Sequence, residues 1–111
     1  LGREIICGKN NTQNDFLSTK FAEKNDWWFH VKGGAGSHVI MRCEADEDPD
    51  ARDFTEAAQA AAYFSDERAS SNVAVDYTRV KCVKKPSGSA PGHVLYTDYY
   101  TAYVNPAKPK G

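Results

Sequence analysis

The segment WWFHVKGGAGSHVIMRC, residues 27–43, places two strand-like runs on either side of a glycine-rich turn. Residues 27–32 are aromatic and β-branched, and residues 38–43 form a second apolar run, so both are expected to be strands. Residues 33–36 are expected to form a turn, because so many glycines leave the backbone too free to hold a regular ladder. The segment therefore predicts a hairpin-like unit with a long tip.

The first of these strands has two chemically different faces, because side chains alternate across a strand. One face suits a protein core and carries Trp27, Phe29 and Val31. The opposite face is expected to be open to water or to a ligand, and it carries Trp28, His30 and Lys32.

Two helices are predicted outside this hairpin. Residues 12–23 carry apolar side chains at helical spacing behind a capping residue at Thr12. Residues 53–69 are rich in alanine and begin with Asp53 and Glu56, which fit a capping box. The small side chains of this second helix would let it lie close against a sheet.

Four further segments are short, β-branched or aromatic and bounded by turn residues, which favours strands. They are residues 3–8, 73–85, 93–97 and 100–104. The second of these, residues 73–85, is either one long strand or a bent pair, and the last two suggest a terminal hairpin. The element order predicts an α+β fold: a mainly antiparallel β-sheet packed with two α-helices in a single domain, residues 1–106, followed by a flexible tail, residues 107–111.

The composition is that of one compact domain: 111 residues, 41% of them hydrophobic and 26% charged. No apolar run is long enough to span a membrane, and no leader is evident. Met41 is the only methionine, so the chain is expected to be a piece of a longer cytoplasmic protein. Three widely spaced cysteines favour reduced thiols over disulfides, and the absence of a Cys-x-x-Cys pair argues against a structural zinc. No metal or cofactor is expected.

The net charge of −1 hides an uneven distribution. Residues 44–56 hold seven acids and one base, so the rest of the chain has a net charge of +5. An acidic surface loop opposite a basic face is compatible with this pattern. The average charge alone would argue against a polyanion-binding protein.

Several segments resemble, in order and over about residues 3–106, the NFACT-R domain family. The matching segments are Gly8-Lys9-Asn10-Asn11-x-Gln13-Asn14-Asp15, Asp26-Trp27-Trp28-Phe29-His30-Val31, Gly36-Ser37-His38-Val39, Ala57 to Ser65, Arg68 with Ser70-Ser71, Val75-Asp76-Tyr77-Thr78, and Lys84-Lys85-Pro86-x-Gly88 with Pro91-Gly92. In one departure, Ala35 stands where the family usually has proline, which would leave the loop looser.

The resemblance implies a non-catalytic RNA-binding domain, found at the C-terminal end of large ribosome-associated factors and also as small stand-alone proteins. In the large bacterial members it acts with the other domains of the same chain to recognise tRNA on the obstructed large ribosomal subunit, where the factor directs alanine tailing of the stalled chain. Some members carry an older label as fibronectin-binding proteins. The implied partners are therefore tRNA and the large subunit, with no membrane.

Unpaired RNA is commonly bound by flat rings that stack bases and by cations that hold phosphates. The open face of residues 27–32 and the neighbouring strand would supply such groups from Trp28, His30, Lys32, His38 and Arg42. The alternative is that Trp28 covers a second layer of core and that both histidines are buried hydrogen-bonding groups.

Two other features are candidates for phosphate contacts. The glycine-rich tip with Ser37 would offer backbone amides, although a plain flexible turn is equally compatible. Arg79, Lys81 and Lys85 would share one strand face, with Lys84 opposite, although solvated surface lysines are the simpler reading of each. The complete candidate set is Lys9, Asn10, Asn11, Gln13, Asn14, Trp28, His30, Lys32, Ser37, His38, Arg42, Arg68, Arg79, Lys81, Lys84 and Lys85.

Two other function classes remain open. A hydrolase would need Ser37 held within reach of a histidine, with Asp26 behind it, and a flexible turn is a poor place for such a nucleophile. A protein-interaction or adhesion module without RNA affinity is the stronger rival, and it would show an exposed apolar patch.

Overall fold

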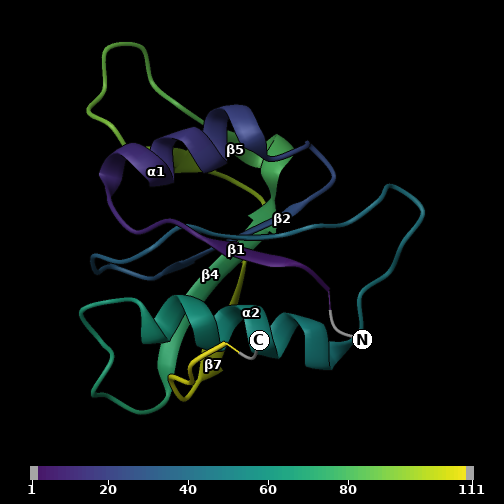
Figure 1. Ribbon diagram of the computed structural model, residues 1–111, viewed down its shortest axis with the longest axis vertical. Helices are drawn as coiled ribbons and strands as arrows, with labels where there is room; N and C mark the ends of the chain where they lie inside the picture. The colour runs from purple at the N-terminus through teal and green to yellow at the C-terminus, as the bar shows by residue number, and fades with distance from the viewer. Residues whose placement is uncertain (1–2, 110–111) are drawn as a thin grey trace.

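The computed structural model describes residues 3–109 and has a five-stranded antiparallel sheet at its centre (Figure 1). The strand order is β1-β3-β2-β4-β7. The strands are β1 (Ile5–Cys7), β3 (Val39–Met41), β2 (Trp27–Val31), β4 (Val73–Arg79) and β7 (Tyr100–Val104). The predicted α+β class and the pairing of β2 with β3 are confirmed, with Trp27 opposite Met41 and Phe29 opposite Val39.

One face of the sheet packs against helix α2 (Ala51–Tyr63). Trp27, Phe29 and Val31 belong to this core, as predicted from the alternation along β2. Five alanines of α2 are buried, and their small side chains let the helix lie close to the strands. Figure 1 shows α2 on one side of the sheet, with α1 and β5 on the other.

The opposite face carries a second layer that the sequence reading left as an alternative. It consists of α1 (Asn11–Phe16), the continuing π-helical turn η1 (Leu17–Phe21), and a small two-stranded sheet of β5 (Val83–Lys84) and β6 (Leu95–Tyr96). Beneath it lies a second core formed by Leu17, Trp28, Ile40 and Val80. The central sheet is therefore covered by α2 on one face and partly covered by the second layer on the other.

Both helices begin earlier than predicted, and for the same reason. The N-cap of α1 is Asn10, whose side chain accepts from the Gln13 amide, while the Gln13 side chain accepts from the Lys9 amide. Helix α2 has a full capping box between Asp50 and Asp53. The predicted caps at Thr12 and at Asp53 with Glu56 were wrong, because a usable polar pair lies two or three residues upstream in each case.

The C-terminal half also departs from the prediction in two places. After β4 the chain makes a 3-10 turn, η2 (Val80–Cys82), which turns Val80 into the second core, so residues 73–85 form a bent pair. The predicted terminal hairpin is wrong. β6 pairs with β5, whereas β7 pairs with β4 in the main sheet.

Residues 105–109 have no regular secondary structure, and the Ala107 amide donates to the Gln59 carbonyl of α2 at 3.4 Å. Lys110 and Gly111 lie outside the described residues, so the flexible tail stays a prediction. Within residues 3–109, no helix is long and apolar enough to cross a membrane.

Candidate nucleic-acid interface

Trp28 lies inside the second core with 1% of its surface exposed. Its indole N–H donates to Ser18 Oγ at 3.0 Å, and Ser18 Oγ lies 2.6 Å from His38 Nδ1. Tyr96 of β6 packs on the indole, with the ring centroids 4.7 Å apart. The expectation that Trp28 is an open stacking surface is therefore wrong, because α1, η1 and the β5–β6 sheet cover it.

His38 is a buried structural histidine. Ser18 Oγ accepts from Trp28 and also shares a hydrogen bond with His38 Nδ1, in which the donor is set by the histidine tautomer. Burial, and then the neighbouring His30, lower the pKa of His38 to about 4. His30 is only half-buried and stacks on Trp28 at 5.8 Å, and burial lowers its pKa as well. Both rings are neutral at pH 7, so neither is a phosphate-binding cation.

The polar run from Gly8 to Asp15 joins three parts of the fold. Asn14 is buried, and its side-chain oxygen accepts from the His38 amide at 3.1 Å. A Cβ on Gly8 would lie 2.0 Å from that same oxygen, so only glycine fits there. Asp15 accepts from Lys85 at 2.6 Å and from the Gly92 amide at 3.0 Å. These contacts tie α1 to the start of β3 and to the loop after β5.

Three of the predicted site residues in this run therefore have structural roles. Asn14 is buried, and the side chains of Asn10 and Gln13 are used in the cap of α1. Lys9 and Asn11 are exposed. The same sequence motif thus supplies both a scaffold and two outward side chains.

The glycine-rich tip does not present free amides in the way that was expected. The Ser37 amide donates to the Phe64 carbonyl, and its hydroxyl donates to the Gly8 carbonyl. The Ala35 amide donates to the Asp66 carboxylate at 3.3 Å. Since a carboxylate already occupies part of the tip, a phosphate would be repelled there.

Several predicted cations are already paired. Lys32 contacts Asp76 at 3.3 Å, Arg42 contacts Asp26 at 3.3 Å, and Lys85 contacts Asp15. Lys32 follows the end of β2, and Arg42 follows the end of β3. Because these strands are antiparallel, with Trp27 opposite Met41, the two cations lie at opposite ends of the strand pair. The predicted grouping of both with Trp28 and the histidines is therefore wrong.

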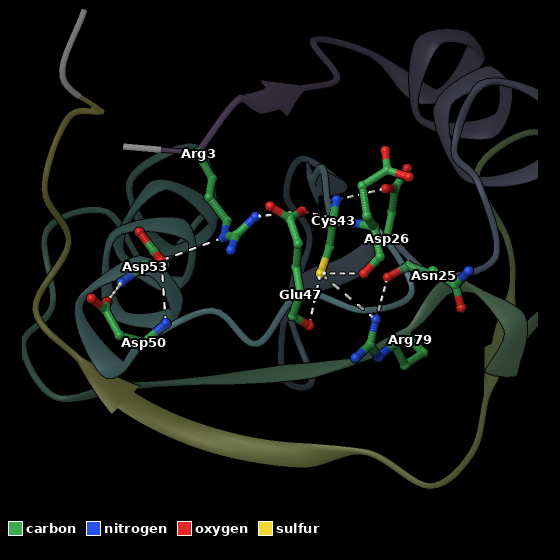
Figure 2. Close-up of polar contacts among 9 residues, drawn as sticks. Arg3, Asn25, Asp26, Cys43, Glu47, Asp50, Asp53 and Arg79 are labelled. Carbon is green, nitrogen blue, oxygen red and sulfur yellow. Dashed lines mark hydrogen bonds and ion pairs between the residues drawn. The ribbon is translucent and has the colours of Figure 1, made fainter. Parts of the chain in front are cut away.

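The two remaining arginines of the predicted set lie on aromatic rings. Arg79 lies over Trp27, 4.4 Å from the ring centroid, and donates to the Asn25 carbonyl, as Figure 2 shows. Arg68 lies over Tyr63 at 4.0 Å. Arg79, Lys81 and Lys85 do not form the predicted stripe, because the 3-10 turn after Arg79 breaks the alternation of a strand.

Five lysines that remain free lie in one layer of the molecule. We call residues 8–26 and 80–98 the α1 layer; it holds six bases and four acids. Its lysines with exposed side chains and no ion pair within residues 3–109 are Lys9, Lys20, Lys24, Lys81 and Lys84. The backbones of Lys81 and Lys24 are hydrogen-bonded at 3.2 Å, which brings two of them together. Lys20 and Lys24 were missed from the sequence, because nothing local shows that η1 lies beside η2.

The other layer has the opposite charge. We call residues 43–72 the α2 layer; it holds nine acids and two bases. Figure 2 shows Arg3 reaching from the N-terminal strand toward Glu47 and Asp53, with Asp50 beside them. The acidic segment ends in α2, on the opposite face of the sheet from α1, whereas its start at Glu44 lines a pocket with Glu23 and Asn25. Within residues 3–109 no cluster of metal-ligating side chains is present.

Residues 2–98 match the family described as NFACT protein RNA binding domain. The chain belongs to this family. Among its NFACT relatives, the Rqc2 homolog RqcH of Bacillus subtilis (strain 168) is 47% identical over 105 residues, which are 95% of this chain and 18% of the relative. The Rqc2 homolog RqcH of Streptococcus suis (strain 05ZYH33) is 43% identical over 106 residues, 96% of this chain and 19% of the relative. The chain thus spans about a fifth of the length of these relatives.

A solved structure has the same NFACT fold. The C-terminal part of the fibronectin/fibrinogen-binding protein from Streptococcus suis superposes with a TM-score of 0.85 at 45% sequence identity. The match covers 93% of this chain and 41% of that one. The arrangement of both layers around the sheet is therefore shared with a close relative.

Proposed function

We propose that this chain is a non-catalytic RNA-binding module of a ribosome quality-control factor, and that it binds RNA through the α1 layer. The observation that carries the proposal is the set of five free lysines on that layer, in a chain whose family is described as RNA-binding. Lysines that neutralise phosphates release counterions, which favours binding. The acidic α2 layer would face away from the RNA, since like charges repel.

The finer part of the proposal concerns partners. The relatives' name, Rqc2 homolog, supports a role in ribosome quality control. On this proposal the chain contacts tRNA or ribosomal RNA of a stalled large subunit in the cytoplasm, next to other domains of a longer protein, and supports alanine tailing of the nascent chain. On the same proposal, the module does not perform that chemistry itself.

The absence of catalysis is supported by where the reactive side chains lie. Ser18 and His38 form the one hydrogen bond between a serine and a histidine side chain among the described residues, and both side chains are buried. No carboxylate hydrogen-bonds the histidine to orient it. The carboxylate of Asp26 accepts from the Cys43 and Glu23 amides instead, so the triad considered from the sequence is not assembled.

Fluorescence anisotropy with labelled tRNA, an unrelated RNA hairpin and duplex DNA, each over a salt series, tests the proposal. The double variant Lys81→Ala/Lys84→Ala should weaken RNA binding and reduce the salt slope by about 1.4 for single strands, from about 0.7 per phosphate contact. Arg52→Ala/Lys108→Ala removes two exposed cations elsewhere and should change little. No RNA binding by the unaltered chain, or equal losses in both variants, would contradict the proposal.

A protein-interaction or adhesion module is the second candidate. It is favoured by the name of the solved relative, a fibronectin/fibrinogen-binding protein, and by exposed apolar side chains such as Leu95. Such binding would depend on apolar contact and would be nearly indifferent to salt. Binding of fibronectin that persists at high salt, together with no RNA binding, would select this alternative.

A further inference from the structure

The second layer covers only part of its face of the sheet and leaves the β4–β7 end open. Along that face, Lys32, Ala74 and Tyr103 lie side by side on β2, β4 and β7. Tyr103 is paired with Ala74 in the β4–β7 register. The Lys32 amide donates to the Ala74 carbonyl at 2.9 Å. Tyr103 is 64% exposed, so a flat ring stands in solvent beside a small alanine.

A second ring lies beside Lys32, outside this row. Tyr99 immediately precedes β7, is 45% exposed and lies over Lys32, whose Nζ is 4.8 Å from the ring centroid. Because successive same-face residues of an extended chain are about 6.6 Å apart, Tyr99 and Tyr103 stand about 13 Å apart. The smaller Thr101 lies between them. We call Lys32, Ala74, Tyr99 and Tyr103 the tyrosine platform.

The platform is held in place from below. Asp76 is buried and accepts from Tyr96 at 2.6 Å, from Thr101 at 2.7 Å and from Lys32. These bonds fix the lysine and the strand that carries the tyrosines. At the far end, the Asn72 amide donates to the Asn105 side chain at 2.8 Å, which ties the start of β4 to the end of β7. Rings on such a rigid support lose little freedom when they bind a ligand.

We propose that the tyrosine platform stacks unpaired nucleobases of the RNA bound by the α1 layer. The inference rests on the proposed function and adds a ligand class to it: single-stranded RNA with splayed bases. Trp28, the ring that the sequence favoured for this task, is buried, whereas the platform offers exposed rings next to a lysine. Stacking on aromatic side chains is how unpaired bases are commonly held. Tyr99 and Tyr103 lie beyond residues 2–98, the part that matches the family.

The tyrosine platform lies next to the β5–β6 sheet, which carries one of the free lysines. Tyr96 hydrogen-bonds Asp76 beneath the platform and belongs to β6, whose neighbour β5 carries Lys84. Tyr99 and Tyr96 are also in contact, with the ring centroids 5.2 Å apart. An RNA strand with its phosphates on the α1 layer would therefore reach the platform without crossing the acidic α2 layer.

The chain offers a matched control for the test. Tyr100 lies on the same strand, is 60% exposed, and faces the opposite side of the sheet, since it pairs with Tyr77 of the α2 core. The experiment compares Tyr103→Ala, Tyr103→Phe and Tyr100→Ala by anisotropy with an unstructured oligouridylate and with an RNA duplex. Thermal unfolding of each variant checks that the fold is kept.

Tyr103→Ala should weaken oligouridylate binding by about 5- to 100-fold, the range for loss of one stacked base. Duplex binding should not change, Tyr103→Phe should bind as the unaltered chain does, and Tyr100→Ala should have no effect. Equal binding by Tyr103→Ala and the unaltered chain overturns the platform. If Lys81→Ala/Lys84→Ala still weakens RNA binding in that case, the proposed function stands without it. A loss of the same size in Tyr100→Ala also overturns the platform.

Discussion

At the scale of single residues, His38 shows how burial changes the role of a side chain. In the sequence it is one of three histidines and a plausible RNA contact. In the fold its ring is hydrogen-bonded to Ser18 and packs edge-on against Trp28, with the centroids 5.3 Å apart. The sequence left an RNA contact and a buried hydrogen-bonding group as alternatives, and the burial of His38 fits the second. The sequence could not identify its hydrogen-bonding partner, because Ser18 lies on a different element 20 positions away.

The buried His38 makes stability depend on pH. Its pKa is lowered in the folded state to about 4, whereas an unfolded histidine titrates near 6.5. The unfolded chain therefore binds a proton first, and stability falls as the pH drops below about 6.5, by up to about 3 kcal/mol at pH 4. Urea unfolding between pH 7 and pH 4.5 measures this loss.

The controls for this pH series are two glutamine variants. His38→Gln keeps an acceptor for Ser18 but cannot titrate, so its stability should fall less steeply over the same range. His93→Gln removes an exposed histidine and should keep the slope of the unaltered chain. The buried-histidine explanation fails if all three proteins show the same slope.

At the scale of elements, the helices α1 and α2 were found in the sequence, but their first residues were not. Periodicity indicates where a helix runs, whereas its start depends on which polar side chain turns back to the free amides. Asp50, in the acidic segment, does so for α2. Several acids in that segment have the right chemistry, and the fold selects the one whose backbone is extended at the cap.

Asp50→Ala should therefore lower the free energy of unfolding by about 1 kcal/mol, the usual cost of losing an N-cap. Glu56→Ala is the informative comparison, because the sequence pattern assigned the capping role to Asp53 and Glu56. Glu56 makes no capping bond, so its loss should cost less than that of Asp50. Thermal or urea unfolding at pH 7 measures both, and a larger loss for Glu56→Ala would contradict the observed cap.

At the scale of the whole molecule, charge is separated across the sheet. The α1 layer has an excess of bases and the α2 layer an excess of acids, in a body of 34 × 34 × 26 Å. Salt screens charges beyond about 10 Å at 0.1 M ionic strength, so the acidic layer should affect bound RNA only in dilute buffer. The near-neutral total is compatible with RNA binding for this reason.

Asp46→Asn/Asp48→Asn tests that separation. Both side chains are exposed and form no ion pair within residues 3–109. In water a charge pair about 10 Å apart is worth about 0.4 kcal/mol, so removing two acids on the layer that faces away from the RNA should strengthen binding only slightly at low salt. The gain should vanish at physiological salt. A large gain that persists there would mean that the RNA contacts the acidic layer.

The sequence by itself determined what depends on local periodicity. The alternation along residues 27–32 identified Trp27, Phe29 and Val31 as core, and the alanine-rich segment identified the helix that covers them. The family motif likewise pointed to an RNA-binding domain. The predictions of the core face and of the helix were confirmed because a strand or helix repeats its pattern within a few residues, whatever lies elsewhere in the chain.

Only the tertiary structure decided which rings and cations are available to a ligand. Trp28 is covered by Tyr96, which lies far from it in the sequence, and by Leu17, which belongs to another element. The turn at Val80 sends β5 to a second layer and leaves Tyr103 exposed. Exposure depends on these long-range contacts, because the face opposite a core becomes a surface or a second core according to what packs on it.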